Sequence, residues 1–157
     1  MARFRYSLQS ILDIKLKMET QAKQDFSAAK NALDEEEEKL EALYGRKAAY
    51  EEEAKELLTG VLNVREIEDN KNAILMMDQY IAIQQKQVEL AQKRLEAARE
   101  RLTEVMKERK THETLREKAF EEFMMEEKKQ EGKAIDELTS YTYGQRRKED
   151  AGNGVTV

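Results

Sequence analysis

The 157-residue sequence contains no cysteine, no proline and no tryptophan, and it has only 6 glycines and one histidine. Without cysteine the chain can form neither a disulfide framework nor a zinc–thiolate site, and it has no thiolate nucleophile. Without proline it lacks one of the two residues that punctuate most β and α/β folds. A single histidine excludes a multi-histidine metal site. These absences exclude many of the common kinds of active site.

Long apolar runs are also absent. The chain contains no run of about 18 consecutive apolar residues, which is the length that a membrane-spanning helix needs. The basic start of the chain is interrupted by further charges before an apolar stretch of a signal peptide can form. The lack of cysteine fits a reducing compartment. We therefore expect a cytoplasmic protein.

Charged residues are what the sequence has in excess. They make up 39% of the chain, against roughly 25% in ordinary soluble domains. Glutamate, lysine, alanine and leucine are the most frequent residues, which is typical of long helices and coiled coils. The charges are unevenly distributed, with a net +3 over residues 1–30, −8 over 31–92, +3 over 93–118 and −3 over 119–157.

One break interrupts the helical pattern, at Leu58-Thr-Gly-Val-Leu-Asn-Val-Arg-Glu66. Gly60 can adopt the left-handed conformation that ends a helix. Asn63 followed by Glu66 has the spacing of a capping box at the start of the next helix. The sequence predicts a single domain over 1–148, with a helix at about 8–58, a tip loop at 59–63 and a helix at about 64–143. Residues 149–157 have no periodicity, so we expect a disordered tail.

Both predicted helices carry apolar residues at alternating spacings of three and four, the pattern of a left-handed coiled coil. Eleven of the fifteen positions in the first helix are apolar, and the second helix repeats the pattern over about six heptads. The rows of the first helix are Leu8, Lys15, Ala22, Ala29, Glu36, Leu43, Tyr50, Leu57 and Leu12, Glu19, Phe26, Leu33, Leu40, Lys47, Ala54. Those of the second are Ile67, Ile74, Ile81, Val88, Leu95, Leu102 and Asn70, Met77, Gln84, Ala91, Ala98, Val105, His112.

The short loop makes the two helices antiparallel neighbours. If Leu57 faces Ile67, the numbers of paired residues add up to 124, and Phe4 then lies opposite Phe120. The sequence therefore predicts an all-α fold, a long antiparallel two-helix coiled coil in which the second helix is longer and overhangs. In this register the open end of the hairpin is positive and its tip is negative.

No motif for catalysis or for a cofactor is present. There is no glycine-rich phosphate loop, and the acidic runs Glu35–Glu38 and Glu51–Glu53 lack the spacing of a calcium loop. His112 falls on the predicted seam. The basic segments also carry acidic residues, which disfavours nucleic-acid binding. We expect no cofactor, no metal and no enzymatic activity.

The open end of the hairpin collects six of the ten aromatic residues: Phe4, Tyr6, Phe120, Phe123, Tyr141 and Tyr143. Leu8 and Ile11 leave the regular seam there, while Arg109 and Arg116 occupy seam positions. Two helices that pack as a regular coiled coil cannot bury this much apolar surface. Either the helices close on it locally or a partner covers it, since exposed apolar patches with arginine and aromatics usually mark interaction sites.

Two segments resemble a known family. Phe4-Arg-Tyr-Ser-Leu-Gln-Ser-Ile-Leu-Asp-Ile-Lys15 is similar to the N-terminus of the FliJ family of flagellar type III export stalk proteins. Glu108-Arg-Lys-Thr-His-Glu-Thr-Leu-Arg-Glu-Lys118, continuing to Phe123, resembles the same family's C-terminal region. The resemblance covers nearly all of the chain except its last ten or so residues.

The resemblance implies a two-helix coiled coil, similar to the γ subunit of rotary ATP synthase, whose open end enters a hexameric export ATPase and promotes its assembly. It also implies contact with the membrane export gate and with export chaperones, membrane association through partners only, and a monomeric rod. The residues it places against the ATPase ring are Phe4, Tyr6, Leu8, Ile11, Arg116, Phe120, Phe123, Arg146 and Arg147. Those it places against the gate, at the tip, are Val61, Leu62, Val64 and Ile67.

Two alternatives stay open. One is a rod subunit of another rotary or secretion ATPase, such as an injectisome counterpart or a peripheral stalk. The other is a generic dimeric coiled-coil scaffold, against which the hairpin signal at Gly60 and Asn63 argues.

Overall fold

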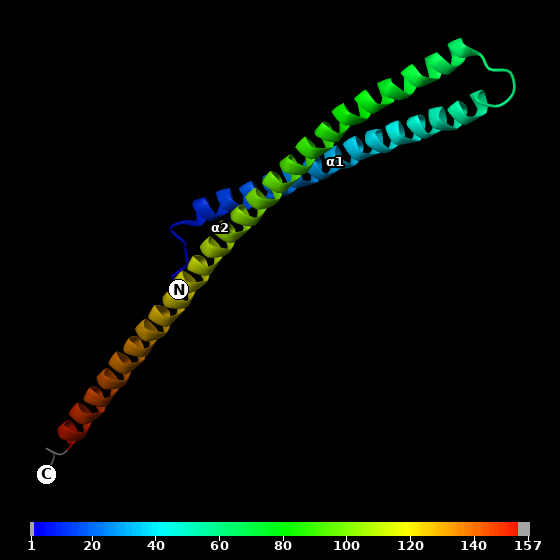
Figure 1. Cartoon of the computed structure of the whole chain (residues 1–157). Coiled ribbons are helices and arrows are strands. Elements are labelled where there is room, and N and C mark those ends of the chain that lie inside the picture. The colour runs from blue at the N-terminus through cyan, green and yellow to red at the C-terminus, as the bar shows by residue number, and fades with distance from the viewer. Residues whose placement is uncertain (1, 154–157) are drawn as a thin grey trace. The chain divides into compact units, whose positions relative to one another are not determined.

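A computed structural model describes residues 2–153 of the chain, and the described part consists of two helices without a strand. Helix α1 spans Gln9–Leu57 and has 49 residues, whereas α2 spans Val64–Asn153 and has 90. Figure 1 shows the two helices joined by one short loop. The predicted all-α hairpin with a longer second helix is confirmed. Neither of the described helices is apolar enough over a sufficient length to cross a membrane.

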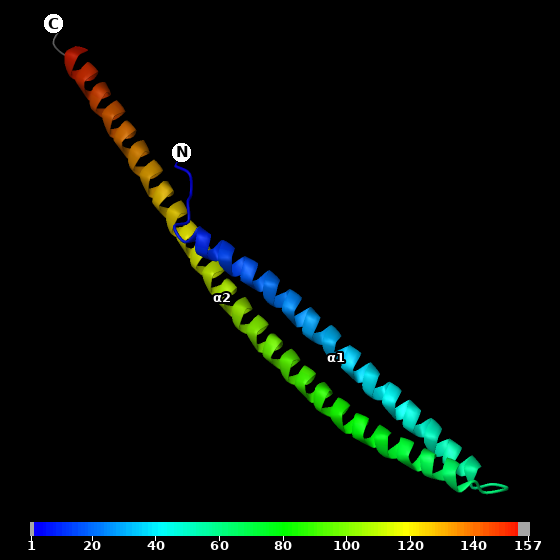
Figure 2. The ribbon, with the colours of Figure 1, turned by 90° about the horizontal axis from the view of Figure 1, so that it is seen from above.

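The chain divides into two compact units. The hairpin unit is Lys15–Glu108, and the terminal unit combines residues 2–14 with residues 109–153 of the described chain. In the hairpin unit α1 and α2 lie side by side in both Figure 1 and Figure 2. In the terminal unit the non-helical residues 2–8 precede the first turns of α1.

The tip loop has the predicted helix-ending and helix-starting chemistry. Gly60 has a φ of 79°, in the left-handed region that costs other residues energy. The Asn63 side-chain oxygen accepts hydrogen bonds from the backbone N–H groups of Arg65 at 3.1 Å and Glu66 at 3.4 Å. These bonds satisfy first-turn donors that have no partner inside the helix. The loop therefore fixes both the end of α1 and the start of α2.

Burial follows the two predicted heptad rows of each helix. The least exposed side chains are Leu12, Glu19, Ala22, Asn70, Met77, Ile81, Val88, Ala91 and Val105. All nine belong to those rows. Because a two-helix seam is narrow, most other row positions are only half-buried.

Polar contacts across the seam of the hairpin unit define its register. Asn70 donates to the Tyr50 carbonyl at 2.9 Å, and an ion pair joins Lys47 to Asp78 at 2.7 Å. Near the other end of the unit, Lys15 and Glu108 pair at 2.8 Å. The residue numbers in these contacts add up to between 120 and 125, in agreement with the predicted pairing.

The predicted end of the second helix and part of the predicted tail are wrong. The second helix was expected to stop at about 143, but α2 continues to Asn153, so residues 149–153 are helical and not disordered. Residues 154–157 of the predicted tail lie outside the described residues. Glutamate, lysine, arginine and alanine are good helix formers, and Gly132 costs only about 1 kcal/mol relative to alanine, which is too little to end a helix.

Candidate functional site

Aromatic rings from both ends of the sequence meet in the terminal unit. The Phe4 ring lies edge-on to that of Phe120, with ring centroids 5.1 Å apart, and tilted against that of Phe123 at 5.4 Å. The sequence register had paired Phe4 with Phe120. Such pairs contribute about 0.5–1.5 kcal/mol beyond the area they bury. We call Phe4, Arg116, Phe120 and Phe123 the aromatic cluster.

Arg116 joins the non-helical segment and α1 to α2. Its guanidinium carbon lies 5.9 Å from the centroid of the Phe4 ring, and its Nε donates to the Gln9 side-chain oxygen at 3.0 Å. A cation over an aromatic face is worth about 0.5–1 kcal/mol at an exposed site. The two contacts restrict the orientation of an otherwise exposed side chain.

Several apolar side chains of the terminal unit, within the aromatic cluster and near it in the sequence, are only partly buried. Phe120 is 45% exposed and Leu8 and Ile11 are 39% exposed each. Phe4, Tyr6 and Phe123 are half-buried. The Tyr6 hydroxyl is itself buried and has no hydrogen-bond partner among the described residues. The helices thus close locally on part of the aromatic surface and leave the rest open.

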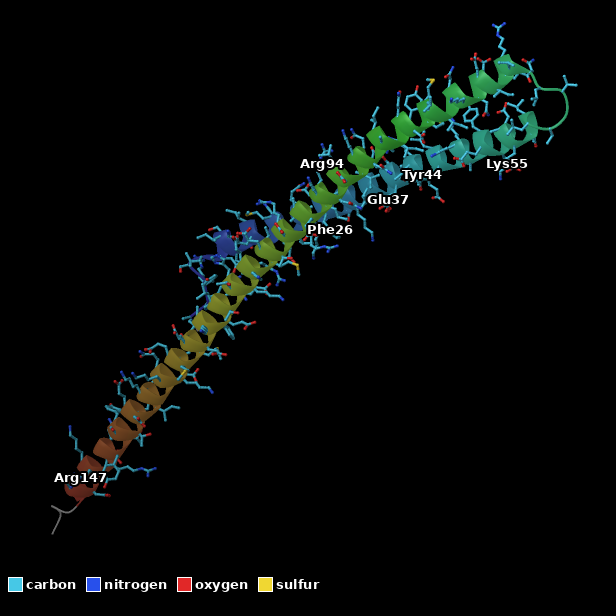
Figure 3. The ribbon with its side chains drawn as sticks, viewed as in Figure 1. Phe26, Glu37, Tyr44, Lys55, Arg94 and Arg147 are labelled. Atoms are coloured by element: carbon cyan, nitrogen blue, oxygen red, sulfur yellow. The ribbon has the colours of Figure 1, made fainter. Side chains whose placement is uncertain are left out.

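Two predicted site residues do not join the cluster. Arg146 and Arg147 lie on the exposed C-terminal part of α2, where Figure 3 labels Arg147. At 1.5 Å per helical residue, Arg146 is about 35 Å along α2 from Phe123. From residue 128 to residue 152 every side chain is exposed. A partner touching both the cluster and these arginines would have to be extended along the helix.

The tip of the hairpin unit presents a second apolar surface. Val61 is 99% exposed, and Leu62 and Val64 are also exposed. Ile67, the fourth predicted tip residue, is half-buried and lines an apolar pocket of about 260 Å³. The other side chains of the pocket are Ala54, Leu57, Leu58, Asn70, Lys71, Ile74 and Leu75.

Two polar contacts of the hairpin unit shift pKa values. The hydrogen bond from Gln84 lowers the pKa of the Glu36 carboxyl, burial opposes this shift, and the positive charge of Lys39 adds to the lowering. The hydrogen bond to Asp78 and the negative charge of Asp78 raise the pKa of Lys47. Both pairs join α1 to α2, so their role is structural.

Among the described residues, neither the aromatic cluster nor the tip surface could form a metal site. In the part of the chain that the structure describes, no group of three or more histidine, aspartate or glutamate side chains could hold a metal ion. His112 is half-buried, and its Nδ1 has no hydrogen-bond partner in residues 2–153. What the surfaces offer is apolar area with oriented charge, which suits the binding of another protein.

Comparison with known families decides the relationship. Residues 4–148 match the family model described as flagellar FliJ protein. The chain belongs to the FliJ family. The match begins at Phe4 and extends past Arg147, so it spans the aromatic cluster, the tip and the C-terminal arginines. None of the curated proteins compared with this FliJ-family sequence matches it.

A solved structure shares the fold of this FliJ-family chain. It is described as a YscO homologue, CT670, from Chlamydia trachomatis. The two structures superpose with a TM-score of 0.75 over 93% of this chain and 99% of that chain, at 22% sequence identity. At this identity the likeness concerns the arrangement of the two helices.

The structure adds surface residues that the sequence reasoning did not select. Gln9, which accepts a hydrogen bond from Arg116, was not selected because it is polar and lies outside the two heptad rows. Exposed apolar residues also run along α2 at Met76, Tyr80, Ile83 and Leu90. Each of these residues comes one position before a residue of the α2 seam rows, so they have the same heptad spacing. The seam rows already explained this periodicity, and the second row was therefore not recognised.

Proposed function

We propose that this chain is a non-enzymatic central stalk of the flagellar type III protein export apparatus, in the cytoplasm. In this proposal the terminal unit binds a hexameric export ATPase and promotes the assembly and activity of its ring. The single observation that carries the proposal is the aromatic cluster, an oriented arginine within partly exposed aromatic surface in a FliJ-family chain. No cofactor, metal or nucleic acid takes part.

The chemistry of the cluster supports a protein contact. Binding energy at interfaces is concentrated in a few aromatic and arginine anchors, each worth about 2 kcal/mol or more. Phe120 with Leu8 and Ile11 supplies apolar area, and Arg116 supplies a charge whose orientation is already fixed. Fixing a side chain before binding reduces the entropy lost on association.

The tip is proposed to contact the membrane export gate, which would link the ring to the membrane through partners. Val61, Leu62 and Val64 are the exposed apolar side chains there, and Ile67 supports them from the pocket. The net charge of −8 over residues 31–92 favours a basic surface on the gate. Export chaperones are further proposed partners, to which we assign no residues.

The ring contact is tested by adding the purified full chain to a purified export ATPase. The wild-type chain is expected to increase hexamer formation in sedimentation and the rate of ATP hydrolysis. Phe4→Ala and Arg116→Ala should each weaken both effects, whereas Val61→Asp at the tip should leave them unchanged. Full activation by both cluster variants, or none by the wild type, would defeat the proposal.

A second candidate is a rod subunit of another type III secretion ATPase, favoured by the shared fold with the YscO homologue. The two candidates differ in the ATPase that responds. Activation of a flagellar export ATPase but not of an injectisome ATPase supports the flagellar assignment, and the reverse result supports the alternative.

A further inference from the structure

Close to the tip loop, the seam of the hairpin unit is open on one flank. An apolar pocket of about 260 Å³ lies there between the last turns of α1 and the first turns of α2. Lys71, which lines it, lies seven residues before Asp78, and Asp78 pairs with Lys47 at 2.7 Å on this flank. The exposed apolar row that contains Met76 and Ile83 lies on the other side of α2.

The pocket exists because one layer of the seam is small. Ala54 faces Asn70 in the predicted pairing, and the layers on either side of it carry larger apolar residues. The Asn70 amide is turned toward the Tyr50 carbonyl, to which it donates at 2.9 Å. A methyl group opposite an amide that points along the seam leaves the space beside them unfilled.

The walls of the pocket are apolar and its rim is exposed. Leu57, Ile67 and Ile74 are half-buried, whereas Leu58 and Leu75 at the rim are 67% and 52% exposed. A dry cavity of about 150 Å³ holds a benzene molecule, so 260 Å³ has room for one phenyl ring. Pockets for whole small-molecule ligands usually exceed about 300 Å³. The size therefore favours one aromatic side chain over a free ligand.

One cation lies at the edge of the pocket. Lys71 is the only charged residue among those that line it, and it forms no ion pair within residues 2–153. The next lysine on this flank, Lys47, is already paired with Asp78 at 2.7 Å and with Glu51 at 3.8 Å. A carboxylate brought in beside the inserted ring would therefore meet an unpaired ammonium group.

We propose that the pocket between Ala54 on α1 and Lys71 on α2 receives a single phenylalanine side chain of a partner protein, with a carboxylate of the same segment on Lys71. The ring supplies the buried apolar anchor, and the carboxylate makes a charge-assisted hydrogen bond. The exposed tip residues Val61, Leu62 and Val64 do not line the pocket. This contact is therefore separate from the one proposed for the export gate.

The charges disfavour a second copy of this chain as the partner. A copy related by two-fold symmetry about the pocket would place its own Lys71 beside this one. Residues 51–71 of each copy contain seven acidic and three basic residues, so the two tips would also repel each other. Like charges placed opposite each other cost binding energy. A carboxylate in an otherwise uncharged segment avoids both costs.

The test titrates the full chain with short synthetic peptides and follows its methyl groups by NMR. The probe peptide carries phenylalanine next to glutamate in an otherwise uncharged sequence, and two control peptides replace the phenylalanine by alanine or the glutamate by lysine. The ring of the probe should shift the methyl signals of Ile67 and Ile74 and leave those of Ile135 unchanged. The probe should bind about tenfold more tightly than either control. Absence of these shifts, or equal affinity of the three peptides, overturns the proposal.

Filling the pocket from within the chain should block it. Ala54→Leu places a side chain in the hollow, so it should raise the midpoint of thermal unfolding and weaken binding of the probe at least about tenfold. Ala49→Leu adds the same side chain at an exposed position of α1 outside the lining and should leave binding unchanged. Equal losses in the two variants, or full binding by a stabilised Ala54→Leu protein, contradict the proposal.

Charge reversal tests the second half of the contact. Lys71→Glu should make the lysine peptide bind more tightly than the probe, while Val61→Asp in the tip loop should leave both affinities unchanged. Circular dichroism verifies that each variant remains helical. Loss of the probe in Val61→Asp would locate the contact on the loop and overturn the proposal. A dimer that Ala54→Leu dissolves in sedimentation would also overturn it, because a second copy would then occupy the pocket.

Discussion

At the scale of single residues, one aromatic ring holds the start of the chain against α2. Phe4 contacts Phe120, Phe123 and Arg116, and residues 2–8 have no helix of their own to support them. The attachment depends on a few contacts of modest energy. Removing the ring should therefore loosen the local structure without unfolding the hairpin unit.

Phe4→Ala should lower the free energy of local opening around the cluster by about 1–2 kcal/mol, the combined worth of an aromatic pair and a cation–π contact. Hydrogen exchange of the amides of residues 9–14 should accelerate about tenfold. Tyr143→Ala, which removes an exposed ring, is the control and should leave this exchange unchanged. Equal exchange in the wild-type and Phe4→Ala proteins would show that the ring does not hold the segment.

Glu36 should make the stability depend on pH. The hydrogen bond from Gln84 lowers the pKa of Glu36 in the folded chain. Its stabilising effect is thus present above the ordinary glutamate pKa and is lost as the pH falls through the lowered folded-state value. When the pH is lowered from neutral to acid, the melting temperature of Glu36→Gln should fall by less than that of the wild type. Identical loss in both proteins would show that the contact has no effect on stability.

At the scale of helices, the sequence predicts which residues are buried on the seam more accurately than it predicts where the helices end. The heptad rows and the Gly60–Asn63 break predicted the buried residues and the start of α2, because packing and capping both leave local signals. The C-terminal end of α2 leaves none. From residue 128 to residue 152 no burial marks where the helix stops, so only weak intrinsic propensity decides. The exposed apolar row of α2 at Met76, Tyr80, Ile83 and Leu90 was not predicted, because the periodicity of the neighbouring seam row already accounted for the pattern.

Two glycine substitutions should have opposite effects on the helices. Neither Gly60 nor Gly132 has an atom within 4 Å of an added Cβ, so only backbone conformation matters. Gly132→Ala should stabilise α2 by about 1 kcal/mol because it lies in a helix interior. Gly60→Ala should destabilise the hairpin by about 1 kcal/mol because φ is 79° there. Thermal unfolding followed by circular dichroism measures both, and a stabilised Gly60→Ala variant would contradict this account of the loop.

At the scale of the whole molecule, two polar side chains on the seam have their hydrogen-bond partners within the same chain. Asn70, buried on the seam, bonds to Tyr50 of the same chain, and Gln84 bonds to Glu36. A polar residue at a seam position specifies one pairing over others. The chain therefore has no need of a second copy to complete its main core.

Sedimentation equilibrium should accordingly give the mass of one chain, 18.3 kDa. Asn70→Leu should keep the chain helical but allow association into larger species, because the polar residue that selects the intrachain pairing is gone. A wild-type mass twice that of the chain would favour the dimeric scaffold, and a strictly monomeric Asn70→Leu protein would show that Asn70 does not choose the partner.

The heptad pairing of the hairpin unit also makes its length a modular quantity. Each layer of the seam contacts only the layers next to it, as in repeat proteins. Deleting seven residues from α1 and the seven that face them on α2 would shorten the unit by about 10.5 Å and leave every remaining layer with its own neighbour. Deletion of a number that is not a multiple of seven would turn the surviving apolar rows away from each other. Lineages could thus have adjusted the span of this unit in whole heptads, one matched pair of insertions or deletions at a time, without redesigning the seam.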